Sequence, residues 1–276
     1  MKTVITTVVA GGALLVSAAP AQAAPAGATS AGGVPGAAHA VPAEVAPKDP
    51  LRALKARLVP GHGVRFTEAT SLKADGVTAP LLKRTGTFQF SKKGIAASDI
   101  TAKWGTATGR ADEKPERVIS IGKVSYESSD MWKDKMPPGK TWYRSGGLPG
   151  GGSGFYGQVI NPAEPGTLAA LLKKGKRSGS TLKGTITFKE LAKVSPWFDA
   201  SVPIRSDNAA KVSYTVTFAG SGLATKVTSS YAANAVFDTS ALDGKTITSE
   251  TRYTGWGRKV SIKAPAPDTV TAKVSD

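Results

Sequence analysis

The chain has 276 residues, no cysteine, two histidines and a formal net charge of +16. Without cysteine it can hold no disulfide, no thiolate metal site, no cysteine nucleophile and no acylated N-terminal cysteine. The excess of positive charge favours anionic partners, such as lipid head groups or acidic polymers, and would attract nucleic acid only through charge, without a specific site.

Residues 1–23 have the pattern of a secretory signal peptide. A positively charged start is followed by an uncharged apolar run over residues 4–19, and Ala21-Gln22-Ala23 fits a small-x-small cleavage site. A membrane anchor is the alternative, but the run is rich in Ala and Gly and shorter than the roughly 20 residues that a span needs. We therefore expect a secreted, extracellular protein, either free or loosely associated with the cell envelope.

The composition changes twice along the rest of the chain. Residues 24–47 consist almost entirely of Ala, Pro, Gly and small polar residues. Such a segment cannot bury a core and predicts a flexible linker. Residues 48–276 have a length that suits one large domain, and no second linker of this kind divides them.

A short helix is predicted where the linker ends. Asp49 is a suitable N-cap and Pro50 suits the first turn. The apolar face of this helix would consist of Leu51, Leu54 and Leu58. Pro60-Gly61 would end it.

Strands are predicted after this helix because apolar and polar residues alternate. The first three cover residues 64–72, 82–91 and 95–104, and on the second of these the shared side contains Leu82, Gly86, Phe88 and Phe90. Residues 118–126 predict either a buried strand or one with a bulge at Gly122. A Pro-Gly turn then leads into a short strand that contains Trp142.

Residues 145–158 form a glycine-rich segment that has two interpretations. A phosphate-binding loop would need the Gly-Lys-Ser/Thr ending of a P-loop or a tight strand-to-helix turn, and the segment has neither. We therefore expect a mobile surface loop.

The second half predicts one more helix and a meander of strands. Thr167 is the expected cap of a helix over residues 168–174, and residues 190–194 predict one helical turn that stops before Pro196. Alternating strands lie on either side of the turn at residues 219–222. A closing strand over residues 260–264 would end the sheet. Each strand has one apolar face, which needs a cover.

Several of these elements together resemble the LolA/LppX-like superfamily of exported lipid carriers, most of all the LppX/LprAFG lipoproteins. The similarity covers residues 48–270. It is carried by the Pro-led first helix and, in chain order, by Gly86 to Phe90, Tyr126, Gly139 to Trp142, the helix Thr167 to Lys174, Gly184 to Phe188, the strand-turn-strand at residues 217–227 and Gly257 to Pro265. It implies an α+β fold, in which a strongly bent, unclosed antiparallel half-barrel holds a few short helices in its concave mouth. Many members have an acylated cysteine, so this chain would be a non-lipidated, secreted form.

The resemblance also implies an apolar cavity between the sheet and the helices. The first hypothesis is therefore a non-enzymatic carrier of lipid or another hydrophobic molecule. The residues expected to line its cavity are Phe66, Phe88, Phe90, Ile186, Phe188, Tyr214, Val216, Phe218 and Ile262.

The alternative is a basic envelope-associated module that binds an anionic polymer or a protein partner and has no ligand in its cavity. Its contacts, or contacts to an anionic membrane surface, would come from Lys173, Lys174, Lys176 and Arg177.

Enzymatic chemistry is not expected from these residues. His39 lies in the linker and His62 in a Pro-Gly-His-Gly turn, so neither suits a catalytic triad or a zinc site. Asp130 and Asp134 could form a glycosidase pair, but they lie in a polar, lysine-rich stretch and are expected to be solvated. We expect no catalytic residue, no metal and no cofactor.

Overall fold

A computed structural model describes residues 49–274, so the predicted signal peptide and the whole of the predicted linker lie outside the described residues. In the described part, twelve strands form one open sheet in the order β12-β6-β5-β4-β3-β2-β1-β11-β10-β9-β8-β7. All neighbouring pairs are antiparallel except β12 and β6, which are parallel. The predicted α+β class, with an unclosed antiparallel sheet and a few short helices, is confirmed.

The strands vary from two to fifteen residues in length. They are β1 His62–Ala74, β2 Val77–Ser91, β3 Gly94–Trp104, β4 Glu116–Ile121, β5 Val124–Ser128, β6 Trp142–Ser145, β7 Lys176–Ser178, β8 Thr181–Thr187, β9 Lys211–Phe218, β10 Ala224–Ala232, β11 Thr246–Lys259 and β12 Val270–Thr271. The α-helices are α1 Pro50–Lys55, α2 Pro165–Lys174, α3 Phe188–Val194 and α4 Pro196–Ser201.

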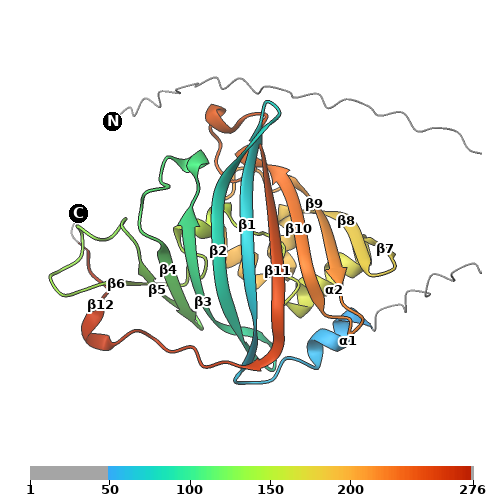
Figure 1. Cartoon of the computed structure of the whole chain (residues 1–276), viewed down its shortest axis with the longest axis horizontal. Helices are drawn as coiled ribbons and strands as arrows, with labels where there is room; N and C mark the ends of the chain where they lie inside the picture. Colours follow the sequence, from blue (N-terminus) through green and yellow to red (C-terminus); the bar gives the residue numbers. More distant parts are fainter. Residues whose placement is uncertain (1–48, 275–276) are drawn as a thin grey trace, which may run out of the picture. The chain divides into compact units, whose positions relative to one another are not determined.

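The chain builds the sheet from its centre outward and then returns from the far edge. Strands β1 to β6 extend the sheet in one direction, and the chain then crosses to α2 and β7 at the opposite edge. Strands β8 to β11 lead back until β11 pairs with β1 (Figure 1). Apart from α1 at the lower edge, the helices lie behind the strands in this view, so one face of the sheet is covered and the other is turned toward the reader.

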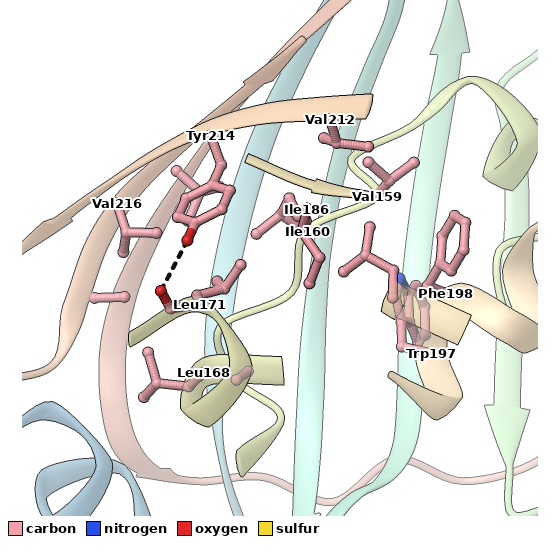
Figure 2. Close-up of a cluster of buried hydrophobic side chains, with 14 of the residues drawn as sticks. Val159, Ile160, Leu168, Leu171, Ile186, Trp197, Phe198, Val212, Tyr214 and Val216 are labelled. Carbon is pink, nitrogen blue, oxygen red and sulfur yellow. Dashed lines mark hydrogen bonds between the residues drawn. The ribbon is translucent and has the colours of Figure 1, made fainter. Parts of the chain in front are cut away.

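The covered face of the sheet forms the main core. Apolar side chains from alternate strand positions pack against the helices, and Figure 2 shows those from β8 and β9 facing α2 and α4. Leu168 and Leu171 of α2 and Phe198 of α4 are almost completely buried. Short helices can therefore cover a wide sheet here, because a long connecting segment with Val159 and Ile160 fills the space between them.

Local sequence explains where the helices begin. Asp49 Oδ1 accepts hydrogen bonds from the backbone N–H groups of Leu51 and Arg52, as the sequence predicts. Thr187 and Glu190 form a capping box on α3. The predicted cap of α2 is wrong, since this helix begins at Pro165 after Glu164, and Thr167 instead donates to the Glu164 carboxylate.

Five other predictions differ from the structure. The first helix ends at Lys55, so Leu58 lies beyond it. Residues 118–126 form two paired strands, because Gly122 has a positive φ of 59° and turns the chain into a hairpin. Residues 260–264 form no strand, and β11 ends at Lys259. A helix, α4, begins directly at Pro196, since Ser195 caps it and a proline suits the first turn. The glycine-rich segment contains the partly buried 3₁₀ turn Gly152–Tyr156 and is not a surface loop.

One hydrogen bond in the core gives a simple test of the helix–sheet packing. The Tyr214 hydroxyl on β9 donates to the Leu171 carbonyl at the end of α2 over 2.7 Å (Figure 2). Tyr214→Phe should lower the free energy of unfolding by about 1 kcal/mol, because the carbonyl loses its donor while the ring is kept. Urea unfolding would measure this change. An unchanged midpoint would show that water replaces the hydroxyl.

Candidate functional site

Eight of the nine residues predicted to line a cavity lie in the packed core. Phe66, Phe88, Phe90, Ile186, Phe188, Tyr214, Val216 and Phe218 are each 0–4 % exposed. Their rings pack against each other and against α4, with the Phe66 and Phe88 centroids 4.8 Å apart and those of Phe88 and Trp197 5.0 Å apart. The cavity beside Phe66 and Phe88 has a volume of only about 10 Å³. In this part of the covered face, helices and side chains fill the space.

Ile262 is the exception, because it is not on the covered face. It is half-buried and follows the end of β11, where its backbone N–H donates to Gln89 Oε1 over 2.7 Å. Its predicted inward position is therefore wrong. The alternation of residues 260–264 suggested a strand, but after a single backbone bond from Val260 to Gly61 the segment leaves the sheet.

An open groove of about 480 Å³ lies elsewhere, between one end of β3 and β4 and the start of α2 and α4. Its walls are mostly small or apolar residues, with Trp197 the largest side chain. They are Ser91, Lys93, Gly94, Ile95, Ala96, Ala97, Ser98, Ser120, Gly122, Pro149, Glu164, Pro165, Gly166, Val194, Pro196, Trp197 and Ala200. None of the nine predicted cavity residues is among them. The groove exists because the sheet side of this wall has small residues where the rest of the core has large ones.

The groove contains few polar side chains. Ser98 is 1 % exposed, and its hydroxyl has no hydrogen-bond partner in the described part of the chain. Ser120 bonds to Ser125 over 2.7 Å, and Lys93 is exposed. A buried hydroxyl without a partner costs free energy, so Ser98 is a natural contact for a polar atom that enters the groove.

Glu164 forms the polar part of the helix wall. Its Oε1 accepts the Trp197 backbone N–H over 2.7 Å, and its Oε2 accepts the hydroxyls of Ser195 and Thr167. Burial raises the pKa of Glu164 to about 7, and the three hydrogen bonds only partly oppose this effect. The carboxyl thus joins the start of α2 to the start of α4 beside the groove.

A second buried polar cluster explains the glycine-rich segment. Arg84 and Glu68 form a two-bond ion pair, with Nε to Oε1 at 2.8 Å and Nη2 to Oε2 at 2.9 Å. The backbone N–H of Gln158 also donates to Glu68, and that of Ser153 donates to Glu116. These backbone donors therefore serve the protein's own carboxylates, which leaves them unavailable to a phosphate.

Close packing at Gly157 holds this segment against the ion pair. A Cβ at this position would lie 2.0 Å from Arg84 Nη2, so only glycine fits. The sequence showed the glycines, but the carboxylates that they approach come from distant strands.

The four predicted anion contacts lie together at the end of α2 and on β7, where all are exposed. Lys174 Nζ pairs with Glu190 Oε1 at 2.6 Å, and this contact, with the Thr187 bonds, lowers the Glu190 pKa to about 2. The Arg177 guanidinium lies 5.8 Å from the centre of the Phe218 ring. Lys173 and Lys176 form no ion pair within residues 49–274. Two of the four predicted anion contacts, Lys174 and Arg177, thus already interact with neighbouring side chains of the protein.

Of the residues considered for catalysis, His39 lies outside the described residues, and the other three lie apart from the groove. His62 is at the start of β1, with Nδ1 3.2 Å from the Pro60 carbonyl. Asp130 accepts the Lys114 backbone N–H, and Asp134 is exposed. Among the described residues, no three His, Cys, Asp or Glu side chains form a group suited to a metal ion. No helix in the described region is long and apolar enough to cross a bilayer.

Comparison with known proteins gives matches to solved structures alone. No protein-family model matches the sequence, and no curated protein does. The chain is similar to the lipoprotein LppX of Mycobacterium tuberculosis, with 13% identity and a TM-score of 0.31 over 77% of this chain and 99% of that one. It is also similar to a LolA superfamily protein from Nitrosomonas europaea, with 12% identity and a TM-score of 0.29 over 74% and 90% of the two chains.

Both structures bear the names of the superfamily that the sequence resembles. The open sheet with helices on one face is established by this chain's own strands and helices.

Proposed function

We propose that this protein is a secreted, non-enzymatic carrier that binds a lipid or another hydrophobic molecule in the groove between β3, β4 and helices α2 and α4. The single observation behind this proposal is the groove itself, whose volume of about 480 Å³ lies in the range of roughly 300–1,000 Å³ that is usual for small-molecule sites. The resemblance of the sequence to exported lipid carriers supports the same class of ligand.

The walls of the groove favour a ligand with a long apolar part. Ile95, Pro165 and Trp197 offer apolar surface, and each Å² that a ligand buries against them contributes roughly 25 cal/mol. Ser98 could donate one hydrogen bond to the ligand, and Lys93 could contact an anionic end. A single acyl chain with a small polar head has this combination of properties.

Reversible binding is a better use of these residues than catalysis. The groove has one carboxyl, Glu164, whose two oxygens already accept hydrogen bonds from the protein. Ser98 has no histidine or other general base beside it as a hydrogen-bond partner. A nucleophile needs such a base, so this arrangement supports holding a molecule unchanged.

Closing the groove with a larger side chain should abolish ligand binding. Ala200 lies on α4 and lines the groove, and Ala200→Phe would place a ring in the space that the ligand needs. We expect the affinity for N-phenylnaphthylamine, a neutral apolar fluorophore, to fall by ~10-fold or more, because the ring replaces the ligand's apolar contacts. Fluorescence titration measures this change. Ala209→Phe, at an exposed turn outside the groove, is the matched control and should bind as the wild type does.

Native mass spectrometry of the protein purified from the culture medium into which it is secreted would identify the ligand. A discrete added mass that solvent extraction releases as a lipid, and that is lost in Ala200→Phe, would support the carrier. A bare mass together with equal fluorophore binding by both variants would contradict it.

A further inference from the structure

The uncovered face of the sheet is strongly basic. This outer face consists of the side chains that alternate with core residues on β1–β4 and on β8–β11 as far as Thr254. Nine of them are basic and two are acidic, which gives a net charge of 9 − 2 = +7. The basic residues are Arg65, Lys73, Lys83, Lys103, Arg117, Lys183, Lys211, Lys226 and Arg252, and the acidic ones are Asp99 and Glu250. Figure 1 views the sheet from this side.

A depression of about 440 Å³ lies near the middle of this face. Its lining includes Gly86, which has no side chain and is half-buried. Five threonines surround it from four neighbouring strands, and their hydroxyls form no hydrogen bond to other described residues. They are Thr67, Thr85, Thr87, Thr101 and Thr254.

Most of the positive charges at the depression and on the strands beside it are not balanced by the protein. Arg117 is neutralised by Asp99 through bonds of 3.0 and 2.8 Å, but Arg65 has no ion pair in residues 49–274. Lys83 and Lys103 are directly opposite each other on β2 and β3, without an acidic partner in the same region. Like charges in this position destabilise a sheet, and an external anion would relieve the repulsion.

We propose that the outer face binds a linear polyanion that carries hydroxyl groups between its phosphate or carboxylate groups, such as an anionic glycan or a polyol phosphate. Arg65, Lys83 and Lys103 would contact the charges, and the threonine hydroxyls would exchange hydrogen bonds with those of the polymer. The basic residues extend across neighbouring strands, which suits an extended chain. This site is separate from the groove and does not depend on the proposed carrier function.

A membrane surface fits this face less well. Five large apolar side chains of the described region are exposed, but none of them lines the depression. They are Val59, Val77, Ile121, Met131 and Ile204. Ile121, at the end of β4, is the one of these five that lies on the outer face, and a single side chain away from the depression is a weak anchor, so contact with a bilayer would depend mainly on charge.

The test compares two double variants that each remove two positive charges. Arg65→Gln/Lys83→Gln changes the outer face, and Lys173→Gln/Lys176→Gln changes the exposed cations beside α2 and β7. Binding to poly(glycerol phosphate) and to polygalacturonate would be titrated between low and physiological salt. The first variant should bind ~10-fold more weakly than the wild type. The slope of log K against the logarithm of the salt concentration should also be smaller in magnitude by about 1 to 2, because two ionic contacts are lost. The second should differ from the wild type by less than ~2-fold.

Each other outcome would overturn the proposal. Equal weakening by both variants would indicate attraction to net charge alone, and tighter binding to phosphatidylglycerol vesicles or to RNA than to either polymer would identify another class of partner. Ala200→Phe, which closes the groove, should bind both polymers normally. Its result therefore separates a failure of this proposal from a failure of the carrier function. Circular dichroism on all variants would exclude misfolding.

Discussion

Replacing Arg84 with alanine is expected to lower the free energy of unfolding by about 3–5 kcal/mol, the largest effect that we expect from any side chain of this protein. The Arg84 and Glu68 side chains are 3% and 2% exposed, so the ion pair is removed from water. Truncating Arg84 would leave the Glu68 carboxylate buried without its counter-charge. Guanidinium unfolding followed by fluorescence would measure the loss.

A double variant separates the penalty of an unpaired charge from the contribution of the ion pair. In Glu68→Gln/Arg84→Met both charges are absent, while the amide oxygen at position 68 can still accept the Gln158 backbone N–H. We expect this protein to recover most of the stability that Arg84→Ala loses, because well-packed neutral replacements of buried pairs are often tolerated. If Arg84→Ala lowers the free energy of unfolding by less than ~1 kcal/mol, water must reach the Glu68 carboxylate in the variant.

The alternation of apolar residues was sufficient to predict most of the sheet. The strands that contain Phe88, Ile186 and Val216 were all found, because period-2 patterns reveal which side chains face a core. The ion pair could not be found in this way. Arg84 lies between Leu82 and Gly86 on the inward side of β2. An arginine at such a position is expected to be buried only when its acidic partner is known, and that partner, Glu68, lies on another strand, β1.

Sequence patterns could not predict the groove, for a related reason. A strand pattern identifies large apolar side chains, and these fill the core, as Phe66 and Phe188 do. The groove is instead formed where Gly94, Ser98 and Ser120 leave space opposite α4, and only the tertiary structure shows that gap. The helix α4 was itself missed because Pro196 was interpreted as a stop, although Ser195 makes it a start.

Glu164 is expected to make the stability of the protein fall as the pH rises from about 4.5 to about 7. Its pKa is about 7 in the folded protein and 4.5 as an ordinary carboxyl, because burial disfavours the charged form. Below pH 4.5 both the folded and the unfolded states hold the proton. Above that pH the unfolded state releases it first, so folding becomes less favourable until the folded state also loses its proton near pH 7.

The size of this effect follows from the two pKa values. Each pH unit between them corresponds to about 1.4 kcal/mol, so the total loss is at most roughly 3 kcal/mol. Other buried carboxyls act in the same direction, since burial raises the pKa of Glu116, and burial with the neighbouring Glu116 charge raises that of Glu127. The contribution of Glu164 must therefore be obtained as a difference between proteins.

Glu164→Gln provides that difference, because the amide is neutral at every pH and keeps an oxygen for the Trp197 backbone N–H. Urea unfolding of both proteins at a series of pH values from 4 to 8 should show the variant's relative stability rising by about 2–3 kcal/mol across this range. Parallel curves would mean that the carboxyl does not titrate in this window.

Glu164→Ala is the companion variant and should be less stable at every pH, because the N–H of Trp197 and the hydroxyls of Ser195 and Thr167 lose their acceptor. Since the same carboxyl joins α2 to α4, a fall in N-phenylnaphthylamine binding by Glu164→Ala but not by Glu164→Gln would connect this contact to the shape of the groove.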